Sequence, residues 1–530
     1  MPFLYDYTSK RSTIWAKQCL KECEESHSSC ERPIPVHVPS KLLHIYRSER
    51  EESLLVSLCY TASSAHTDRG EIRYATLSYC WGGPQDFCLD ATSEEKLLRG
   101  ISVTLLPKTI IDAIKVAFGL GISWIWIDSL CIRQDDTTEK ATEIAQMHQV
   151  YRNSSVTISA TRADSCRQGF LHPCSLPPLG RVSYRLPLAL STGELGSVIL
   201  SKTNEVTPID RRSWTFQEHL LARRVLRFTD FGQHWSCGTT SKFESINPIY
   251  PPRAYKQGIE SIRELARRPK ESHGLLNHVN GWMDIVQQYT RRQLTIASDK
   301  LLAISAIAEA WNPDSEDTYL AGVWESHLPE GLLWACNDGR SHVPSATYVA
   351  PSWSWASISG SINWMVHIRC DLDPHIDIQD YFVELANDCA PYGAVKKGEL
   401  IMRGLLQKTK IREAHSLAIP VEESAPELDL SLAYTALDFY GETLMAKVAD
   451  AYLYCFQITV LHEEDMDGPS GLILASTDNV EFSRIGMFTF FATDLDEDDF
   501  DAMTEEDKAR QHAIQIAAFK NIIPRTFCLI

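Results

Sequence analysis

One part of the chain alternates short apolar runs with longer segments of helical periodicity. The runs 74–80, 122–127 and 155–160 are rich in apolar and β-branched side chains, as strands covered on both faces are. Between these runs, residues 107–118 and 139–152 carry apolar side chains three or four positions apart, which is typical of amphipathic helices. Strands and helices that alternate at these lengths predict an α/β domain with a parallel sheet flanked by helices.

The remainder of the 530-residue chain shows other patterns, and a chain of this length exceeds what one hydrophobic core usually serves. Residues 255–340 have mainly helical periodicity, and short β-prone runs dominate from Tyr348 onward. We therefore expect an α/β N-terminal half, then a helical region and a mainly β C-terminal part. The expected divisions are an N-terminal helical segment at 1–40, the α/β domain at 41–240 with its core at 74–218, the helical region at 241–345 and the mainly β region at 346–530.

Polar residues and glycines gather directly after the first two predicted strands. Trp81 and Gly82 follow the first strand, and the segment 128–136 follows the second. Ligands of open α/β sheets bind beyond the carboxyl ends of the strands, so this edge is the candidate site. The candidate ligand-binding residues are Ser78, Trp81, Gly82, Asp128, Cys131, Gln134 and Asp135.

Each of these residues also has a structural interpretation. Asp128 is suited to bind ribose or adenine groups, or to cap the turn that follows it. Trp81 can stack on a ligand that Gly82 lets the backbone approach, but a tight bend explains the glycine equally well. Cys80 and Cys131 would need a partner histidine or a lowered pKa to act as nucleophiles, and neither has a histidine nearby in the sequence. We therefore favour small buried side chains for both cysteines.

Four residues near the N-terminus have the spacing of metal ligands. They are Cys19, Cys23, His27 and Cys30, and the first three share one face of a helix predicted within 13–30. Structural zinc usually takes two ligand pairs from separate elements, and the sequence contains no Cys-x2-Cys pair. The pattern favours a packing helix over a zinc site, and we predict no metal.

Charge and hydropathy limit the expected partners and location. The formal net charge of −18 argues against general binding of a nucleic-acid backbone, which needs clustered lysine and arginine. Residues 1–15 lack the apolar core of a secretory signal, and no apolar run reaches the ~18 residues of a membrane span. The 15 cysteines are then expected to be reduced thiols. We expect a cytoplasmic protein with no nucleic-acid partner and no membrane span.

Three segments carry a resemblance to a known family. They read TLSYCWGG at 76–83, WIDSLCIRQDD at 126–136 and RSWTFQE at 212–218. In this order and spacing they resemble the heterokaryon-incompatibility (HET) domain of filamentous fungi, which the α/β domain at 41–240 would represent. The resemblance implies non-self recognition, in which fusion of incompatible cells triggers death of the mixed cell. It also implies protein partners in that pathway and allows self-association.

The HET domain is in turn distantly similar to Toll/interleukin-receptor-type domains, some of which cleave NAD. In those domains a tryptophan followed four residues later by a glutamate carries the catalytic carboxylate. Trp214 and Glu218 reproduce this spacing, which puts both side chains on one face of a helix. The resemblance thus implies a catalytic Glu218, a ligand-binding Trp214 and NAD as a substrate, with no established cofactor. The alternative is a core tryptophan and a Glu218 that pairs with Arg223 or Arg224.

The sequence leaves three functions open. The first is a recognition protein that triggers death through partner-induced association, without turnover. The second is an NAD glycohydrolase of the Toll/interleukin-receptor type. The third is a family member recruited to a secondary-metabolite biosynthetic pathway.

Overall fold

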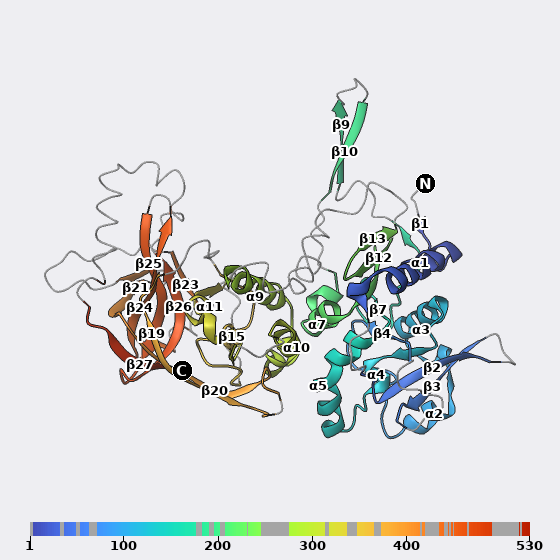
Figure 1. The fold of residues 1–530 in the computed structure, drawn as a ribbon, viewed down its shortest axis with the longest axis horizontal. Helices are drawn as coiled ribbons and strands as arrows, with labels where there is room; N and C mark the ends of the chain where they lie inside the picture. Colours follow the sequence, from blue (N-terminus) through green and yellow to red (C-terminus); the bar gives the residue numbers. More distant parts are fainter. Residues whose placement is uncertain are drawn as a thin grey trace. The chain divides into compact units, whose positions relative to one another are not determined.

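The chain divides into two structural units, Met1–Arg268 and Pro269–Ile530 (Figure 1). No helix in the part of the chain that the structure describes is long and apolar enough to cross a membrane. The structure, a computed structural model, describes residues 4–31, 37–48, 53–62, 72–175, 183–189, 195–201, 207–230, 232–244, 275–312, 317–336, 347–364, 373–388, 390–413, 416–418, 434–438, 444, 447–448, 450–463, 466–489, 519 and 522–530.

A nine-stranded sheet forms the centre of the first unit (Figure 1). The four central strands, β11, β7, β4 and β6, are parallel, whereas the other neighbours pair antiparallel. The expected parallel sheet is therefore corrected to a mixed one. From edge to edge the strands are β13 (Ser241–Glu244), β12 (Gly232–Cys237), β11 (Arg224–Thr229), β7 (Val156–Ser159), β4 (Tyr74–Ser78), β6 (Trp124–Trp126), β2 (Lys41–Arg47), β3 (Leu54–Tyr60) and β5 (Ile101–Ser102).

Burial distinguishes the central strands from the flanking strand β3. Every residue of β4, β7 and β11 is buried, because helices cover both faces of the central strands. In β3, buried positions alternate with partly exposed ones, as in a strand with one covered face. Strands β2 and β3 follow each other along the chain and form an antiparallel pair, which needs no crossover helix.

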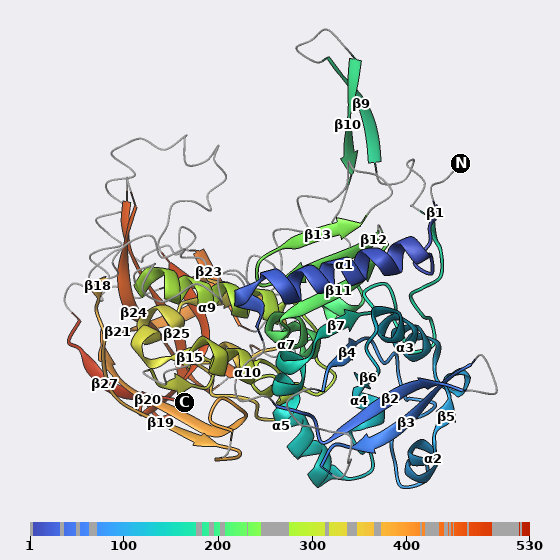
Figure 2. The same cartoon turned by 45° about the vertical axis from the view of Figure 1, so that its right-hand side comes forward.

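Helices cover both faces of this sheet (Figure 2). The helix α3 (Lys108–Leu120) connects β4 to β6, and α5 (Thr137–Asn153) connects β6 to β7. Because β6 and β7 lie on opposite sides of β4, right-handed crossovers put α3 and α5 on opposite faces. Helix α1 (Lys10–Ser26) packs with α3 and β12, whereas α7 (Trp214–Leu221) packs with α5 and β4.

Local signals set the ends of the two crossover helices, which confirm the helices expected at 107–118 and 139–152. Helix α3 ends at Gly121, whose φ of 83° is the left-handed conformation common at helix ends. Helix α5 begins after Asp136, whose carboxylate accepts hydrogen bonds from two N–H groups of the first turn. The other elements of the unit are α2 (Glu94–Arg99), α4 (Asp128–Cys131), the pair β1 (Leu4–Tyr5) and β8 (Cys174–Ser175), and the hairpin β9 (Ser183–Ala189) and β10 (Leu195–Ser201).

The second unit combines helices with a large, mostly antiparallel sheet. A helical part followed by a mainly β C-terminal part is confirmed, although residues 245–274 of the expected helical region lie outside the described residues. Among the described residues, the helices are α9 (Leu275–Thr290), α10 (Leu302–Trp311) and α11 (Leu328–Gly331), and the short pairs are β14 (Tyr319–Leu320) with β15 (Val323–Trp324) and β16 (Trp334–Cys336) with β17 (Ile362–Trp364). The ten-stranded sheet comprises β18 (Asp373–Pro374), β19 (Asp377–Leu385), β20 (Val395–Gly404), β21 (Leu406–Glu413), β22 (Ser416–Ala418), β23 (Tyr434–Leu437), β24 (Tyr452–Glu463), β25 (Met466–Ser476), β26 (Glu481–Thr489) and β27 (Arg525–Leu529).

Candidate functional site

The carboxyl ends of β4 and β6 bring two of the expected polar segments together. The strands are parallel neighbours, with Thr76 opposite Trp126. Residues 79–82 and 128–131 therefore leave the sheet side by side. Helix α7 packs on β4 and adds the third segment, which contains Glu218. Three segments far apart in the sequence thus meet at the edge where ligands of α/β sheets bind.

Glu218 lies at the centre of this edge and points inward. Its side chain is 7% exposed, and its Oε2 accepts a hydrogen bond of 2.5 Å from the Ser78 hydroxyl at the end of β4. The Tyr151 hydroxyl, on α5, donates to the backbone oxygen of Leu77 at 3.1 Å, and its proximity to Glu218 acts to lower the pKa of that carboxyl group. Burial raises the pKa of Glu218 to about 7, whereas the bond from Ser78 acts in the opposite direction. Glu218 therefore changes its charge close to neutral pH.

Asp128 orients the tryptophan that follows β4. Its Oδ2 accepts a hydrogen bond of 2.8 Å from the indole Nε1 of Trp81, and its Oδ1 accepts one of 2.6 Å from the N–H of Ser129. The hydroxyl of Tyr79 donates to the Ser129 hydroxyl oxygen at 2.9 Å. Burial raises the pKa of the Asp128 carboxyl, and the bond from Trp81 acts against that rise. Asp128 thus holds the turn that it begins and fixes the ring of Trp81, which is partly exposed.

Arg212 supplies positive charge beside both carboxyl groups. One of its N–H groups donates to the backbone oxygen of Tyr79 at 3.1 Å. Its charge lowers the pKa values of Glu218 and Asp128, whereas the charge of Asp128 raises the pKa of Glu218. The charge of Asp128 thus adds to burial in raising the pKa of Glu218, and Arg212 offsets part of that rise. We call the following six residues the acid cluster: Ser78, Trp81, Asp128, Tyr151, Arg212 and Glu218.

The other candidate residues of the two loops bond to the protein itself. The side-chain amide of Gln134 donates to the backbone oxygens of Ile132, at 2.8 Å, and of Asp128, at 3.3 Å. Asp135 is exposed, and its carboxylate accepts from the N–H of Ala91 at 2.9 Å. These bonds stabilise the loop after β6, which agrees with a structural role for Gln134 and Asp135.

Both thiols at this edge are buried. Cys131 is fully buried in α4, and burial raises the pKa of its thiol to about 12. Cys80 is 5% exposed, and burial raises the pKa of its thiol to about 11, although Arg212 acts to lower it. A thiolate nucleophile requires a lowered pKa, so the geometry favours small packed side chains at both positions.

Trp214 begins α7 and is partly exposed, four residues before the buried Glu218. Arg223 and Arg224, the alternative partners of Glu218, donate hydrogen bonds to other groups. Arg223 donates to backbone oxygens, among them that of Ser154, and Arg224 donates to a cysteine sulfur and to backbone oxygens. Arg212 is the arginine whose charge lowers the pKa of Glu218.

Arg227 is a buried basic residue that the sequence did not single out for this face of the sheet. Ser78 pairs with Ser159 in β7, and Ser159 pairs with Arg227 in β11, so the three side chains point to the same face. Arg227 is 5% exposed, and its Nε and Nη2 have no hydrogen-bond partner among the described residues. The polar character of the face therefore continues from Ser78 across two neighbouring strands.

The metal-like spacing near the N-terminus gives a group that differs from the expected one. Cys23, His27 and Cys30 lie together, and the fourth member is Cys237 of β12. Their sulfur and ring-nitrogen atoms all lie within 4.8 Å of one another, and Cys19 is not among them. We call Cys23, His27, Cys30 and Cys237 the thiol–histidine cluster. No local spacing indicates Cys237, because only the packing of α1 on β12 brings it close.

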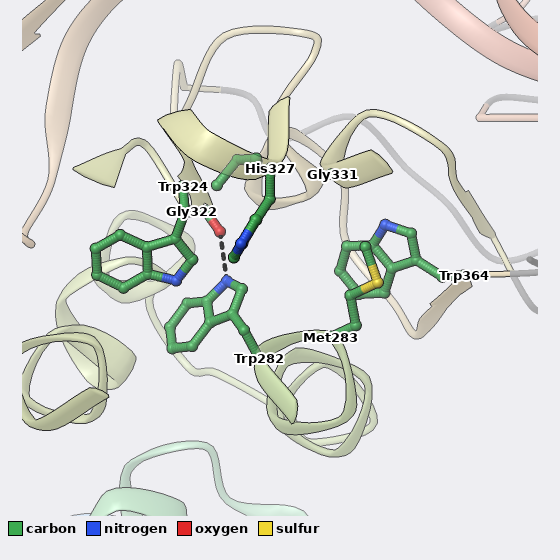
Figure 3. A pocket seen from close by; sticks show the side chains of 8 residues that line it. Trp282, Met283, Gly322, Trp324, His327, Gly331 and Trp364 are labelled. Carbon is green, nitrogen blue, oxygen red and sulfur yellow. Dashed lines mark hydrogen bonds between the residues drawn. The ribbon is translucent and has the colours of Figure 1, made fainter. Parts of the chain in front are cut away.

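A small aromatic pocket lies in the second unit (Figure 3). The indole N–H of Trp282 on α9 donates to the backbone oxygen of Gly322 at 3.0 Å, and the indole N–H of Trp355 donates to the same oxygen at 2.8 Å. Trp282 and Trp324 pack edge to face with ring centroids 5.5 Å apart, and both are buried. This arrangement is that of a packed aromatic core.

Comparison with known proteins identifies the family of one segment. Residues 74–218 match the family described as heterokaryon incompatibility protein (HET). The matched span runs from the start of β4 to Glu218 and contains every residue of the acid cluster. No curated protein and no solved structure matches the chain. The similarity to Toll/interleukin-receptor-type domains stays a prediction.

Proposed function

We propose that this chain, whose residues 74–218 form a heterokaryon-incompatibility (HET) domain, acts in fungal non-self recognition and triggers death of the mixed cell after incompatible cells fuse. The observation that carries the proposal is the family match. It spans three of the four central parallel strands, β4, β6 and β7, reaches to Glu218 in α7, and therefore covers the acid cluster.

The mode of action that we propose is association with a protein partner or a second copy, without turnover of a substrate. Its support is the inward orientation of Glu218, which is 7% exposed and accepts a hydrogen bond from Ser78. This bond joins α7 to β4, so the carboxyl group acts as an internal tie between the two elements. A carboxylate that attacks or orients a substrate needs access to it.

Regulated expression of the full chain in a filamentous fungus tests the proposal. We expect viable cell counts to fall after induction, because the domain at high concentration associates without the partner that normally induces it. Cells with the empty vector serve as the control, and protein amounts are matched by immunoblot. Growth equal to that of the control, with the full-length chain present and folded, contradicts the proposal.

A second candidate function is hydrolysis of the bond between nicotinamide and ribose in NAD, with Glu218 as the catalytic carboxylate. The observation that favours it is the pair of carboxyl groups with raised pKa values at the carboxyl edge of the parallel strands. Ionised Glu218 would stabilise the positive charge that develops on ribose as nicotinamide leaves, and water would then supply the hydroxyl group. This candidate requires nicotinamide release that depends on Glu218.

A further inference from the structure

Three thiols and one imidazole converge between the end of α1 and the end of β12. Cys23 lies in the last turns of α1, and His27 follows the helix directly. Cys30 ends the short 3₁₀ turn Ser28–Cys30, and Cys237 is the last residue of β12. Two separate elements therefore contribute donors, which is the arrangement that the sequence alone did not provide.

The distances suit a tetrahedral metal site. The four donor atoms lie within 4.8 Å of one another, and Nδ1 of His27 is 3.5 Å from Sγ of Cys237. Zinc–sulfur bonds of about 2.3 Å and zinc–nitrogen bonds of about 2.0 Å place tetrahedral donors about 3.5–3.8 Å apart. Small shifts of side chains that already face one another would complete this geometry.

The surroundings supply the hydrogen bonds that zinc-bound thiolates usually receive. The Nε of Arg224 donates to Sγ of Cys23 at 3.0 Å, and the N–H of Thr240 donates to Sγ of Cys237 at 3.4 Å. The turn after β12 approaches closely, since a Cβ at Gly238 would lie 2.9 Å from Sγ of Cys30. These contacts orient sulfur atoms rather than merely fill space around them.

A negatively charged metal site would balance the charge of the buried Arg224. Arg224 is 3% exposed, and its partners among the described residues are the sulfur of Cys23 and the backbone oxygens of Ser155 and Cys30, with no carboxylate. A buried guanidinium without a counter-charge is costly. Zn²⁺ with three thiolates and a neutral imidazole carries one net negative charge, which Arg224 would balance.

We propose that Cys23, His27, Cys30 and Cys237 bind one Zn²⁺ ion, which fastens the N-terminal helix to the sheet. Four protein ligands leave no open position, so the site is structural and not catalytic. Soft thiolate donors with one imidazole favour zinc over magnesium or calcium. The inference does not depend on the proposed role in incompatibility.

Metal analysis of the purified full chain tests the site. We expect one zinc per chain after extensive buffer exchange without chelator, and background zinc in Cys237→Ser. Cys19→Ser is the matched control, because Cys19 is, like Cys237, a buried thiol but lies outside the cluster. It should retain one zinc per chain.

Cobalt exchange gives a second measurement that needs no variant. The wild-type chain loaded with Co²⁺ should show the intense visible absorption of tetrahedral cobalt and the charge-transfer bands of thiolate ligands. Background zinc in the wild-type chain after expression with added zinc, or octahedral cobalt without thiolate bands, overturns the proposal. Equal zinc contents in Cys237→Ser and wild type overturn it as well.

Discussion

Glu218 is a carboxyl group held where its ionised form is unfavourable. Burial and the neighbouring charge of Asp128 raise its pKa from 4.5 to about 7. Between these two pH values the folded chain binds a proton that the unfolded chain has released. The protonated carboxyl therefore contributes stability that is fully present below pH 4.5 and is lost as the pH rises through 7.

We predict that Glu218→Gln stabilises the chain at about pH 8 by on the order of 2 kcal/mol and has little effect at about pH 4.5. Glutamine fills nearly the same space and its amide oxygen can accept the hydrogen bond from Ser78, but it cannot ionise. Thermal unfolding of both chains across this pH range measures the difference.

Asp135→Asn is the control for that series, because Asp135 is an exposed carboxylate in the loop after β6. It should follow the wild-type pH dependence. A Glu218→Gln chain that is less stable than wild type by the same amount at every pH would mean that the folded chain does not penalise the ionised carboxylate.

The turn after β4 shows how one element fits against another. Gly82 and Gly83 both have positive φ values, 71° and 117°. A Cβ at Gly82 would lie 2.2 Å from the Cβ of Ser165 and 2.7 Å from its Cα, whereas a Cβ at Gly83 would meet no atom within 4 Å. The glycine at position 82 therefore permits close packing of two loops, which favours the tight-bend interpretation over approach to a ligand.

These neighbouring glycines allow a matched comparison. We predict that Gly83→Ala costs about 1 kcal/mol, because alanine is strained at positive φ. Gly82→Ala should cost a further ~1–3 kcal/mol, because the added methyl group overlaps Ser165. Unfolding midpoints of the two variants measure the difference. Equal destabilisation would contradict the close packing at Gly82.

Local sequence patterns predict a helix or strand when its apolar spacing reflects its burial, and they miss elements that lack this spacing. Strands β4, β6 and β7 and helices α3 and α5 were predictable because their apolar spacing reflects burial along each element. The flanking strands β2 and β3 were missed, and their antiparallel pairing made the sheet mixed. In β3 buried positions alternate with partly exposed ones, so its pattern differs from the continuous apolar run of a central strand.

At the scale of the whole molecule, the acid cluster and the thiol–histidine cluster differ in how far local sequence patterns predict them. The hydrogen bond between Trp81 and Asp128 follows from parallel strands that end at one edge, where the sequence placed both residues. The partnership of Cys237 with Cys23 could not be predicted, because it depends on a helix and a strand from opposite ends of the first unit. Long-range packing leaves no trace in local spacing.

We propose that the HET domain acts by association and not by turnover at Glu218. The most direct test measures nicotinamide released from NAD by the purified full chain, when dilute and when concentrated with crowding agents, for wild type and Glu218→Gln. We expect no release that depends on Glu218 in either condition, and we expect induced expression of Glu218→Gln to kill cells as wild type does. Release by the wild-type chain that disappears in Glu218→Gln, together with loss of killing, would contradict it.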